Sequence, residues 1–363
     1  MDKMIELQNV SKYYGSTLAV DHLSLAIDQG ELCVLIGPSG CGKTTCAKMI
    51  NRLIEPTEGQ VVVNGIDVMQ IAPQLLRRQI GYVIQSVGLF PHLTVQANVS
   101  VVPELLAWEK NKIARRVDEV LRLVSLEPDL FRSKYPRELS GGEAQRVGVA
   151  RALAADPPIL IMDEPFGAVD PITREKLHVE FLNIHSQLKK TVVFITHFID
   201  EAIRLADKIA VMRAGKIVQY DNSEHILAHP ADSFVKAFLG TDRALKRLLK
   251  LVVQDFMKPV RPVQSTAAIP DLQAYLQDHK FVWVIDVQQK LVGWVDNTAD
   301  MSGGSVTAQM TAIDPEIIAI RTTATLNEAL SKMLDQGIKT VPVVDAHFKL
   351  LGEISLEDIA ILS

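Results

Sequence analysis

Residues 35–49 read LIGPSGCGKTTCAKM, an apolar run that passes through a glycine-rich turn into a helical pattern. Gly37 is followed, after four residues, by Gly42, Lys43 and Thr44. This spacing is typical of a loop whose backbone N–H groups surround a phosphate, with the lysine reaching the β- and γ-phosphate oxygens. The helix that starts here adds its N-terminal dipole. The stretch therefore predicts a nucleoside triphosphate site formed by Ser39, Gly40, Cys41, Gly42, Lys43, Thr44 and Thr45.

A second apolar run, ILIMDEP at residues 159–165, ends in two adjacent carboxylates. Asp163 stands where an acid at the end of a buried strand holds Mg²⁺ together with the Thr44 hydroxyl. Glu164 is then placed to act as a general base on an attacking water. The alternative, an acidic turn on the surface, fits the preceding apolar strand poorly. The pattern predicts that the bound nucleotide is hydrolysed.

The stretch LSGGEAQRVGVARAL, residues 139–153, offers a second set of backbone N–H donors. Ser140, Gly141 and Gly142 open a helix, which makes a second anion-binding turn. Because the first loop already surrounds the phosphates from one side, the second turn implies a second face on the same nucleotide. The economical arrangement is two subunits placed head to tail, each offering its turn to the ATP of the other.

These motifs resemble those of the ATP-binding subunits of ABC transporters. The signature motif of that family, LSGGQ, is LSGGE here, with Glu143 in place of the usual glutamine. The resemblance covers residues 4 to about 240 and implies an ATPase whose cofactors are ATP and Mg²⁺.

The resemblance also implies roles for residues outside the three motifs. Tyr14 matches the aromatic residue that stacks on adenine, with its neighbour Tyr13 as the alternative. Gln85 matches a glutamine that touches Mg²⁺ or the attacking water and faces the membrane partner. Asp170 matches an aspartate at the dimer seam, and His197 matches the switch histidine that contacts the γ-phosphate.

Composition sets limits on the class of protein. The 363 residues are 48% hydrophobic and 22% charged, and the net charge of −5 gives no indication of nucleic-acid binding. No run approaches the roughly 18 apolar residues of a membrane span, and the N-terminus lacks the apolar core of a signal peptide. We therefore expect a cytosolic chain, and the resemblance to ABC ATPases implies a peripheral subunit on the cytoplasmic face of the membrane.

Two parts of the chain differ in pattern. Residues 1–240 alternate β-rich runs with helical stretches, which predicts an α/β domain with a largely parallel sheet flanked by helices. One of these runs is GQVVVNG at residues 59–65. A helical subdomain is expected at about 94–153, where Ile113, Val117, Val120, Leu121 and Val124 recur at helical spacing. A linker helix is expected over residues 241–250.

The rest of the chain contains a weak internal repeat. Residues 306–363 give a short strand, a helix, two strands joined by a turn and a closing helix, and residues 251–300 echo its helix and two strands, which predicts two small α+β modules packed as a pair. The second copy resembles a CBS domain, whose adenosine-nucleotide cleft is framed by positions that match Gly337, Pro342, Gly352, Ser355 and Asp358.

In that family the aspartate binds ribose hydroxyls and the serine lies near phosphate, so Pro342, Ser355 and Asp358 form a candidate regulatory nucleotide site. The first copy departs from the pattern, with Trp283, Asp296 and Ala299 at the proline, serine and aspartate positions. A pair that only dimerises remains the alternative to a ligand-binding pair.

An ABC cassette followed by a CBS pair resembles the ATPases of osmolyte importers, which take up glycine betaine, proline betaine, choline or carnitine. This resemblance implies a homodimeric motor, integral membrane permease subunits and an extracytoplasmic solute-binding protein or domain as partners. Two alternatives stay open: an importer of a different small solute, and a soluble ABC-type ATPase that senses nucleotides through its CBS pair.

Overall fold

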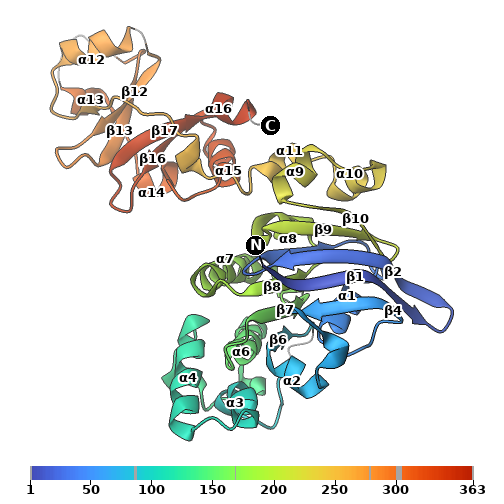
Figure 1. Cartoon of the computed structure of the whole chain (residues 1–363). Helices are drawn as coiled ribbons and strands as arrows, with labels where there is room; N and C mark the ends of the chain where they lie inside the picture. The colour runs from blue at the N-terminus through green and yellow to red at the C-terminus, as the bar shows by residue number, and fades with distance from the viewer. Residues whose placement is uncertain (1, 86–87, 168, 278, 300–304, 362–363) are drawn as a thin grey trace. The chain divides into compact units, whose positions relative to one another are not determined.

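A computed structural model describes residues 2–85, 88–167, 169–277, 279–299 and 305–361. Met1, Asp300 and Ser363, which are ends of expected domains, lie outside the described residues. The chain divides into two compact units, Met1–Thr241 and Asp242–Ser363, which we describe separately (Figure 1). Across the described ranges, no helix has both the length and the apolar character needed to cross a membrane.

The first unit contains a four-stranded antiparallel sheet, ordered β2-β1-β4-β5 within the described residues. Its strands are β1 (Lys3–Tyr14), β2 (Thr17–Asp28), β4 (Glu58–Val63) and β5 (Ile66–Asp67). The run at residues 59–65 is therefore a strand, but it pairs antiparallel with β1 and is not part of the expected parallel sheet. Its short apolar pattern identifies a strand without specifying its partner.

A second sheet of six strands, ordered β10-β9-β3-β8-β7-β6, forms the centre of the first unit as far as it is described. Its strands are β3 (Leu32–Ile36), β6 (Ile80–Val83), β7 (Ile159–Asp163), β8 (Thr191–Ile195), β9 (Lys208–Arg213) and β10 (Lys216–Asp221). All neighbours are parallel except β10, which runs antiparallel to β9. Every residue of β3, β7 and β8 is buried, as expected for parallel strands covered on both faces.

The helices of the first unit surround these sheets (Figure 1). They are α1 (Lys43–Ile50), α2 (Pro73–Arg78), α3 (Val95–Leu105), α4 (Lys110–Leu123), α5 (Pro128–Phe131), α6 (Gly141–Leu153), α7 (Pro171–Leu188), α8 (Ile199–Leu205), α9 (Ser223–Ala228) and α10 (Ser233–Leu239), with 3₁₀ turns η1 (Val68–Gln70) and η2 (Pro136–Glu138).

Helices α3, α4 and α6 contact one another at one edge of the first unit (Figure 1). Helix α4 buries Ile113, Val117, Val120 and Leu121, which confirms the helical spacing read from the sequence. The apolar face of α4 is therefore buried, whereas the bounds of the helical subdomain stay a prediction.

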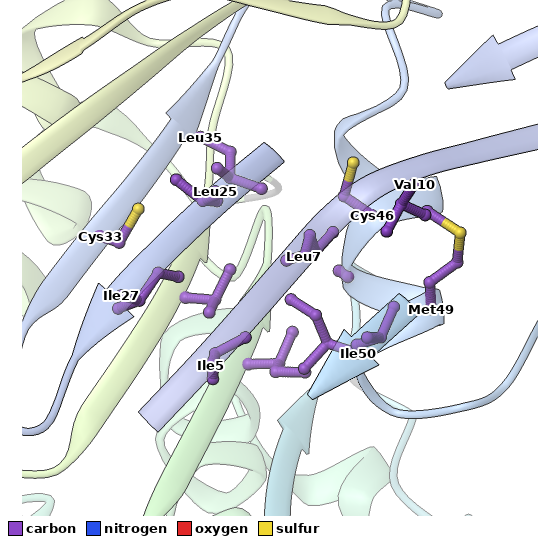
Figure 2. Packing of buried hydrophobic residues seen from close by; sticks show 14 of the residues in the cluster. Ile5, Leu7, Val10, Leu25, Ile27, Cys33, Leu35, Cys46, Met49 and Ile50 are labelled. Atoms are coloured by element: carbon purple, nitrogen blue, oxygen red, sulfur yellow. The ribbon is translucent and has the colours of Figure 1, made fainter. Parts of the chain in front are cut away.

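One hydrophobic cluster fixes α1 beneath the antiparallel sheet. Leu7 and Val10 of β1 belong to the same cluster as Cys46, Met49 and Ile50 of α1 (Figure 2). The most exposed of these five side chains is only 2% accessible. Burying each such side chain contributes roughly 1.5–3 kcal/mol relative to leaving it exposed. This packing holds the helix that follows the glycine-rich turn in a fixed position.

The second unit contains two small sheets in its described part, ordered β11-β12-β13-β14 and β15-β16-β17. The elements of the first copy are η3 (Val253–Asp255), β11 (Val263–Gln264), α12 (Ile269–Leu276), β12 (Phe281–Ile285) and β13 (Leu291–Asp296). Helix α13 (Val306–Gln309), expected to open the second copy, packs Val306 into the hydrophobic cluster of the first copy. The elements of the second copy are β14 (Thr311–Ala312), α14 (Pro315–Ile318), β15 (Ile320–Arg321), α15 (Leu326–Gln336), β16 (Thr340–Val344), β17 (Leu350–Ser355) and α16 (Leu356–Ala360).

The linker helix expected over residues 241–250 is shorter in the structure, where α11 covers only Arg243–Arg247. Leu248 is fully buried in a cluster with Leu326 and Val341 of the second copy. The basic residues of this segment are typical of a solvated helix, but Leu248, which follows α11, is buried, and the segment belongs to the second unit.

The two copies of the repeat exchange backbone segments. β14 of the second copy pairs with β13 of the first, at Gly293 and Trp294. In the same way Lys258, which precedes the first sheet, bridges to Glu353 of β17. A bridge between Lys290 and Lys349 joins the two strand turns. The copies are therefore related by an approximate twofold arrangement, and each completes the sheet of the other.

This exchange requires a glycine at two corresponding positions. A Cβ atom at Gly293 would lie 2.7 Å from the Thr311 carbonyl oxygen, and one at Gly352 would lie 2.6 Å from the Lys258 carbonyl oxygen. Both distances are shorter than a carbon–oxygen contact allows. The close approach of the exchanged backbone thus explains a glycine in the middle of β13 and of β17.

Gly352→Ala is expected to lower the free energy of unfolding of the second unit by about 1–3 kcal/mol, because the exchanged backbone must move away. Denaturant unfolding of the full chain measures this change. Leu351→Ala is the matched control, because the Leu351 side chain is 44% exposed and its loss should cost little. Equal stability of Gly352→Ala and the native chain would show that the exchanged segment can shift without cost.

Candidate active site

A hollow of about 660 Å³ lies at the carboxyl ends of the parallel strands in the first unit. The loop after β3 and the start of α1 form its floor, and single residues that follow β6, β7 and β8 complete the wall. Its lining consists of Ala19, Ser39, Gly40, Cys41, Gly42, Lys43, Thr44, Thr45, Gln85, Glu164 and His197. The structure therefore brings together the phosphate-loop residues and three residues that lie far apart in the sequence.

Lys43 lies at the floor of this hollow with only 7% of its surface exposed. Its Nζ donates to the carbonyl oxygens of Gly37, at 2.7 Å, and Pro38, at 3.0 Å. The ammonium group is thus held among the backbone groups of the loop, within reach of a phosphate placed there. A buried cation of this kind is a strong attraction for a triphosphate.

Glu164 is the central carboxylate of the hollow. Its Oε2 accepts a hydrogen bond from Gln85 Nε2 at 2.8 Å, and its Oε1 lies 3.3 Å from His197 Nδ1. Its backbone N–H donates to the Ile195 carbonyl oxygen, and its φ of 46° is left-handed, which is unusual for a glutamate. Backbone strain of this kind clusters at functional sites. The motif predicted the residue, but nothing in the sequence indicated its left-handed backbone.

Asp163 lies beside the phosphate loop, where Thr44 Oγ1 donates to its Oδ1 at 3.1 Å. Burial raises the pKa of Asp163, and the hydrogen bond from Thr44 only partly opposes this. A hydroxyl and a carboxylate oxygen at this separation, with Gln85 nearby in the wall, are oxygen ligands of the kind that Mg²⁺ takes together with phosphate and water. The residues therefore fit the expected metal, which would be held by Thr44 and Asp163.

Asp163→Asn is expected to stabilise the ligand-free chain near pH 7 by about 1 kcal/mol. A gain of this size is common when an unfavourable group at a functional site is replaced. Because burial raises the pKa of Asp163, ionising this carboxyl costs more in the folded chain than in the unfolded chain; this penalty is absent at low pH and complete above the folded-state pKa. Thermal unfolding with and without Mg²⁺ and ATP measures the effect. The variant should also lose the extra stability that Mg²⁺ adds to the ATP complex; a less stable ligand-free variant would contradict the burial argument.

The signature turn does not line the hollow. Ser140 caps α6, because its Oγ accepts from the backbone N–H of Glu143, and Glu143 Oε2 accepts from the backbone N–H of Ser140 at 2.7 Å. This backbone bond holds the pKa of Glu143 below its usual range. The glutamate that replaces the usual glutamine therefore has a local role at the start of the helix. Gly141 and Gly142 form the first turn of α6 and present their backbone outside the hollow.

Two other candidates also lie outside the lining of the hollow. Tyr14, at the end of β1, is 49% exposed, with Lys12 Nζ 5.5 Å from its ring centroid. Asp170 caps α7 by accepting from the Thr173 backbone N–H at 3.0 Å, and this bond lowers its pKa. Adenine stacking and a place at the dimer seam stay predictions for these two residues.

In the second unit, the candidate nucleotide residues are engaged with one another and with the first copy. Asp358 accepts a hydrogen bond from Ser355 Oγ at 2.6 Å and forms an ion pair with Lys258. Burial alone would raise the pKa of Asp358, but Lys258 and Ser355 outweigh burial and hold it below its usual range. Pro342 is buried opposite Glu353 in the sheet. In the first copy, Trp283 Nε1 donates to Glu353 at 2.7 Å.

The glycine-rich loop with Lys43, the adjacent carboxylates after β7 and the histidine after β8 lie at one hollow, and this arrangement is typical of an ATPase of the ABC class. The ABC transporter family model matches residues 20–167, and the CBS domain family model matches residues 310–362. The chain is 43% identical to the osmoprotectant import ATP-binding protein OsmV of Salmonella typhimurium, over 98% of this chain and 95% of that protein. It is 45% identical to the glycine betaine/carnitine/choline transport ATP-binding protein OpuCA of Bacillus subtilis, over 96% of this chain and 93% of that protein. The chain belongs to this family of ATP-binding proteins of osmolyte-type ABC transporters.

Solved structures agree with the first unit. The ATP-binding cassette MJ0796, in a dimeric post-hydrolysis structure bound to ADP and Pi, is 35% identical to this chain with a TM-score of 0.55. The match covers 60% of this chain and 98% of the MJ0796 chain. The structure of cbiO1 from Clostridium perfringens, part of the ABC transporter complex cbiONQ, is 25% identical with a TM-score of 0.59. These likenesses confirm the expected α/β fold, and the CBS match confirms a CBS domain in the second unit.

Proposed function

We propose that this chain is the ATP-hydrolysing subunit of an importer for quaternary-amine osmolytes such as glycine betaine, carnitine or choline. The observation that carries the proposal is the extent of the similarity. Relatives named for osmoprotectant, carnitine or choline transport match 96–98% of the chain, including the second unit. A spermidine/putrescine import ATP-binding protein of Chromobacterium violaceum is 41% identical but matches only 70% of the chain. The second unit therefore favours the osmolyte branch.

The active enzyme in this proposal is a homodimer with ATP at the seam. The hollow contains Lys43 and Glu164, whereas the backbone donors of Gly141 and Gly142 lie outside it. A second copy would bring its own signature turn to the open side of the hollow. The dimeric cassette bound to ADP and Pi supports this arrangement by its likeness to the first unit.

Hydrolysis follows from the groups that surround Glu164. The phosphates of ATP lie on the backbone of residues 39–45, with Lys43 against the β- and γ-oxygens. Gln85 and His197 each contact one carboxylate oxygen of Glu164, so the carboxylate is held in one orientation while it takes a proton from the attacking water. Mg²⁺, when bound by Thr44 and Asp163, neutralises charge on the phosphate oxygens. Closing and reopening of the dimer then moves the permease.

The permease partner requires a docking surface on the first unit. A groove of about 380 Å³ lies between β6 and α3, beside the residues that precede Gln85. Arg77, Arg78 and Arg151 give it positive charge, and Tyr82 and Phe90 give it apolar surface. A cytoplasmic segment of a permease that carries both carboxylates and apolar side chains would fit this groove. Movement of that segment would then be coupled to Gln85 in the ATP site.

Arg78→Glu is expected to lower permease recovery about tenfold in co-purification, because it places a carboxylate at the exposed rim of the groove, where one repulsive contact costs on the order of 1–2 kcal/mol. The matched control is Arg115→Glu, the same change on the exposed face of α4. Equal recovery of permease with both variants would exclude this groove as the docking surface.

The remaining partners and the place of action follow the same proposal. The chain acts as a peripheral subunit on the cytoplasmic face of the membrane, and an extracytoplasmic protein or domain delivers the solute. The CBS pair regulates the motor by binding an adenine nucleotide or dinucleotide at Pro342, Ser355 and Asp358. Because Asp358 is paired with Lys258, the ribose of such a ligand would compete with that ion pair.

Reconstitution tests the transport function. The chain is purified together with the permease and solute-binding proteins encoded beside it, and ATP turnover is measured in proteoliposomes. We expect turnover to rise with glycine betaine, carnitine or choline, and not with spermidine or maltose. Stimulation by a polyamine or a sugar would contradict the substrate class. An ATPase that co-purifies with no permease would favour the alternative of a soluble regulatory ATPase.

A further inference from the structure

A histidine and a glutamate form a buried pair away from the ATP hollow. His178 Nε2 of α7 lies 2.6 Å from Glu201 Oε1 of α8. The two side chains are only 9% and 4% exposed. A buried pair of this kind loses hydration on folding, and replacing such a pair with apolar side chains of similar volume is often neutral or stabilising. Its presence therefore needs an explanation other than stability.

The position of the pair in the fold suggests that explanation. Helix α7 begins directly after Asp170, and α8 begins two residues after His197. Each helix therefore carries one loop of the ATP site at its N-terminus. The ring of His178 also lies 5.5 Å from the ring of Phe166, which is in the loop between Glu164 and Asp170. The pair therefore joins the two helices that follow Glu164 and His197 in the chain.

Other contacts between the same helices lie nearer the surface. Arg204 pairs with Glu175 at 2.9 Å, and the Glu175 side chain is 65% exposed. Arg174 of α7 lies over the Phe198 ring at 4.1 Å and donates to the Val169 carbonyl oxygen at 2.8 Å. Exposed pairs are weak and adaptable, because water competes for both charges. The buried pair is the contact that fixes one spacing between the helices.

We propose that His178 and Glu201 are positioning residues for ATP hydrolysis: their buried hydrogen bond sets the distance between the switch loop of His197 and the loop of Glu164 and Asp170. This inference rests on the ATPase function proposed above. Neither side chain lines the ATP hollow. A hydrogen bond has a narrow range of lengths, whereas an apolar contact tolerates sliding, so the polar pair holds the catalytic loops in register.

The test replaces the pair with apolar side chains of similar size in the full chain. His178→Leu/Glu201→Leu is expected to keep or raise the melting temperature, while kcat for ATP falls at least tenfold and KM changes less than twofold. Glu201→Gln keeps an acceptor for His178 Nε2–H and is expected to retain kcat within about threefold. The matched control is Glu175→Leu/Arg204→Leu, which removes an exposed ion pair between the same two helices. Its kcat is expected to stay within about twofold of the native value.

Each outcome decides one point. Native kcat in the double leucine variant would overturn the proposal, because apolar packing would then suffice. A fall in kcat that is fully explained by a loss of folded protein would also overturn the proposal, because the role of His178 and Glu201 would then be structural. An equal fall in kcat in the control variant would overturn it for the same reason. Solute stimulation tests the transport proposal separately, since this experiment uses only the basal ATPase of the chain.

Discussion

Glu164→Gln is expected to lower ATP turnover by roughly 10²–10⁴-fold, the usual contribution of a positioned general base. Glutamine has nearly the same shape as glutamate, so its side chain can still contact Gln85 and His197, but its amide cannot take a proton from water. The phosphate loop and Lys43 are unchanged, so the affinity for ATP should stay within a few-fold. Phosphate release and binding of a fluorescent ATP analogue measure the two quantities on the same preparation.

Glu143→Gln is the matched control for this experiment, because it makes the same chemical change at the signature turn. The Glu143 side chain accepts a hydrogen bond from the Ser140 backbone N–H, and glutamine can accept the same bond. We expect turnover of the control within about threefold of native, in line with the modest energy of one hydrogen bond. Near-native turnover in Glu164→Gln would show that another group takes the proton.

Much of the hollow could be predicted from sequence because its residues follow parallel strands. Gln85, Glu164 and His197 come soon after β6, β7 and β8, which are neighbours in one sheet. The carboxyl ends of parallel strands meet at one edge, so apolar runs that end in polar residues predict which side chains meet. This reasoning placed Glu164 in the site, whereas the resemblance to ABC ATPases supplied Gln85 and His197; the structure has all three beside the phosphate loop.

Other features could not be predicted, because they depend on pairing between distant segments. The strand at residues 58–63 pairs with β1, and an apolar run by itself does not specify which strand it joins. The exchange of Lys258 and β14 between the two CBS copies is also non-local, and it places Lys258 on Asp358, a residue expected to bind ribose. The left-handed φ of Glu164 accompanies a hydrogen bond from its backbone N–H to β8 and has no sequence signal.

The strongest test of the dimer seam combines two inactive chains. Lys43→Ala removes the phosphate lysine, and Ser140→Arg fills the signature turn with a large cation. Each variant alone is expected to lose roughly 10²-fold or more in turnover, as when a group that stabilises developing charge is removed. When the two variants are mixed in equal amounts, half of the dimers contain one chain of each kind. In each of these mixed dimers, one of the two sites has a native Lys43 from one chain and a native Ser140 from the other. The mixture should therefore recover about a quarter of the native sites in a twofold dimer.

Ser140→Thr separates an effect on the seam from an effect on the helix, because threonine can still cap α6. The ATP turnover of this variant should stay close to the native value. Loss of the cap alone would cost on the order of 1 kcal/mol of stability and would leave chemistry intact. If the catalytic pocket were complete within one protomer, Ser140→Arg would hydrolyse ATP at the native rate, since Ser140 does not line the hollow of its own chain. Recovery in the mixture, with inactivity of each parent, requires that the two halves of one site come from different chains.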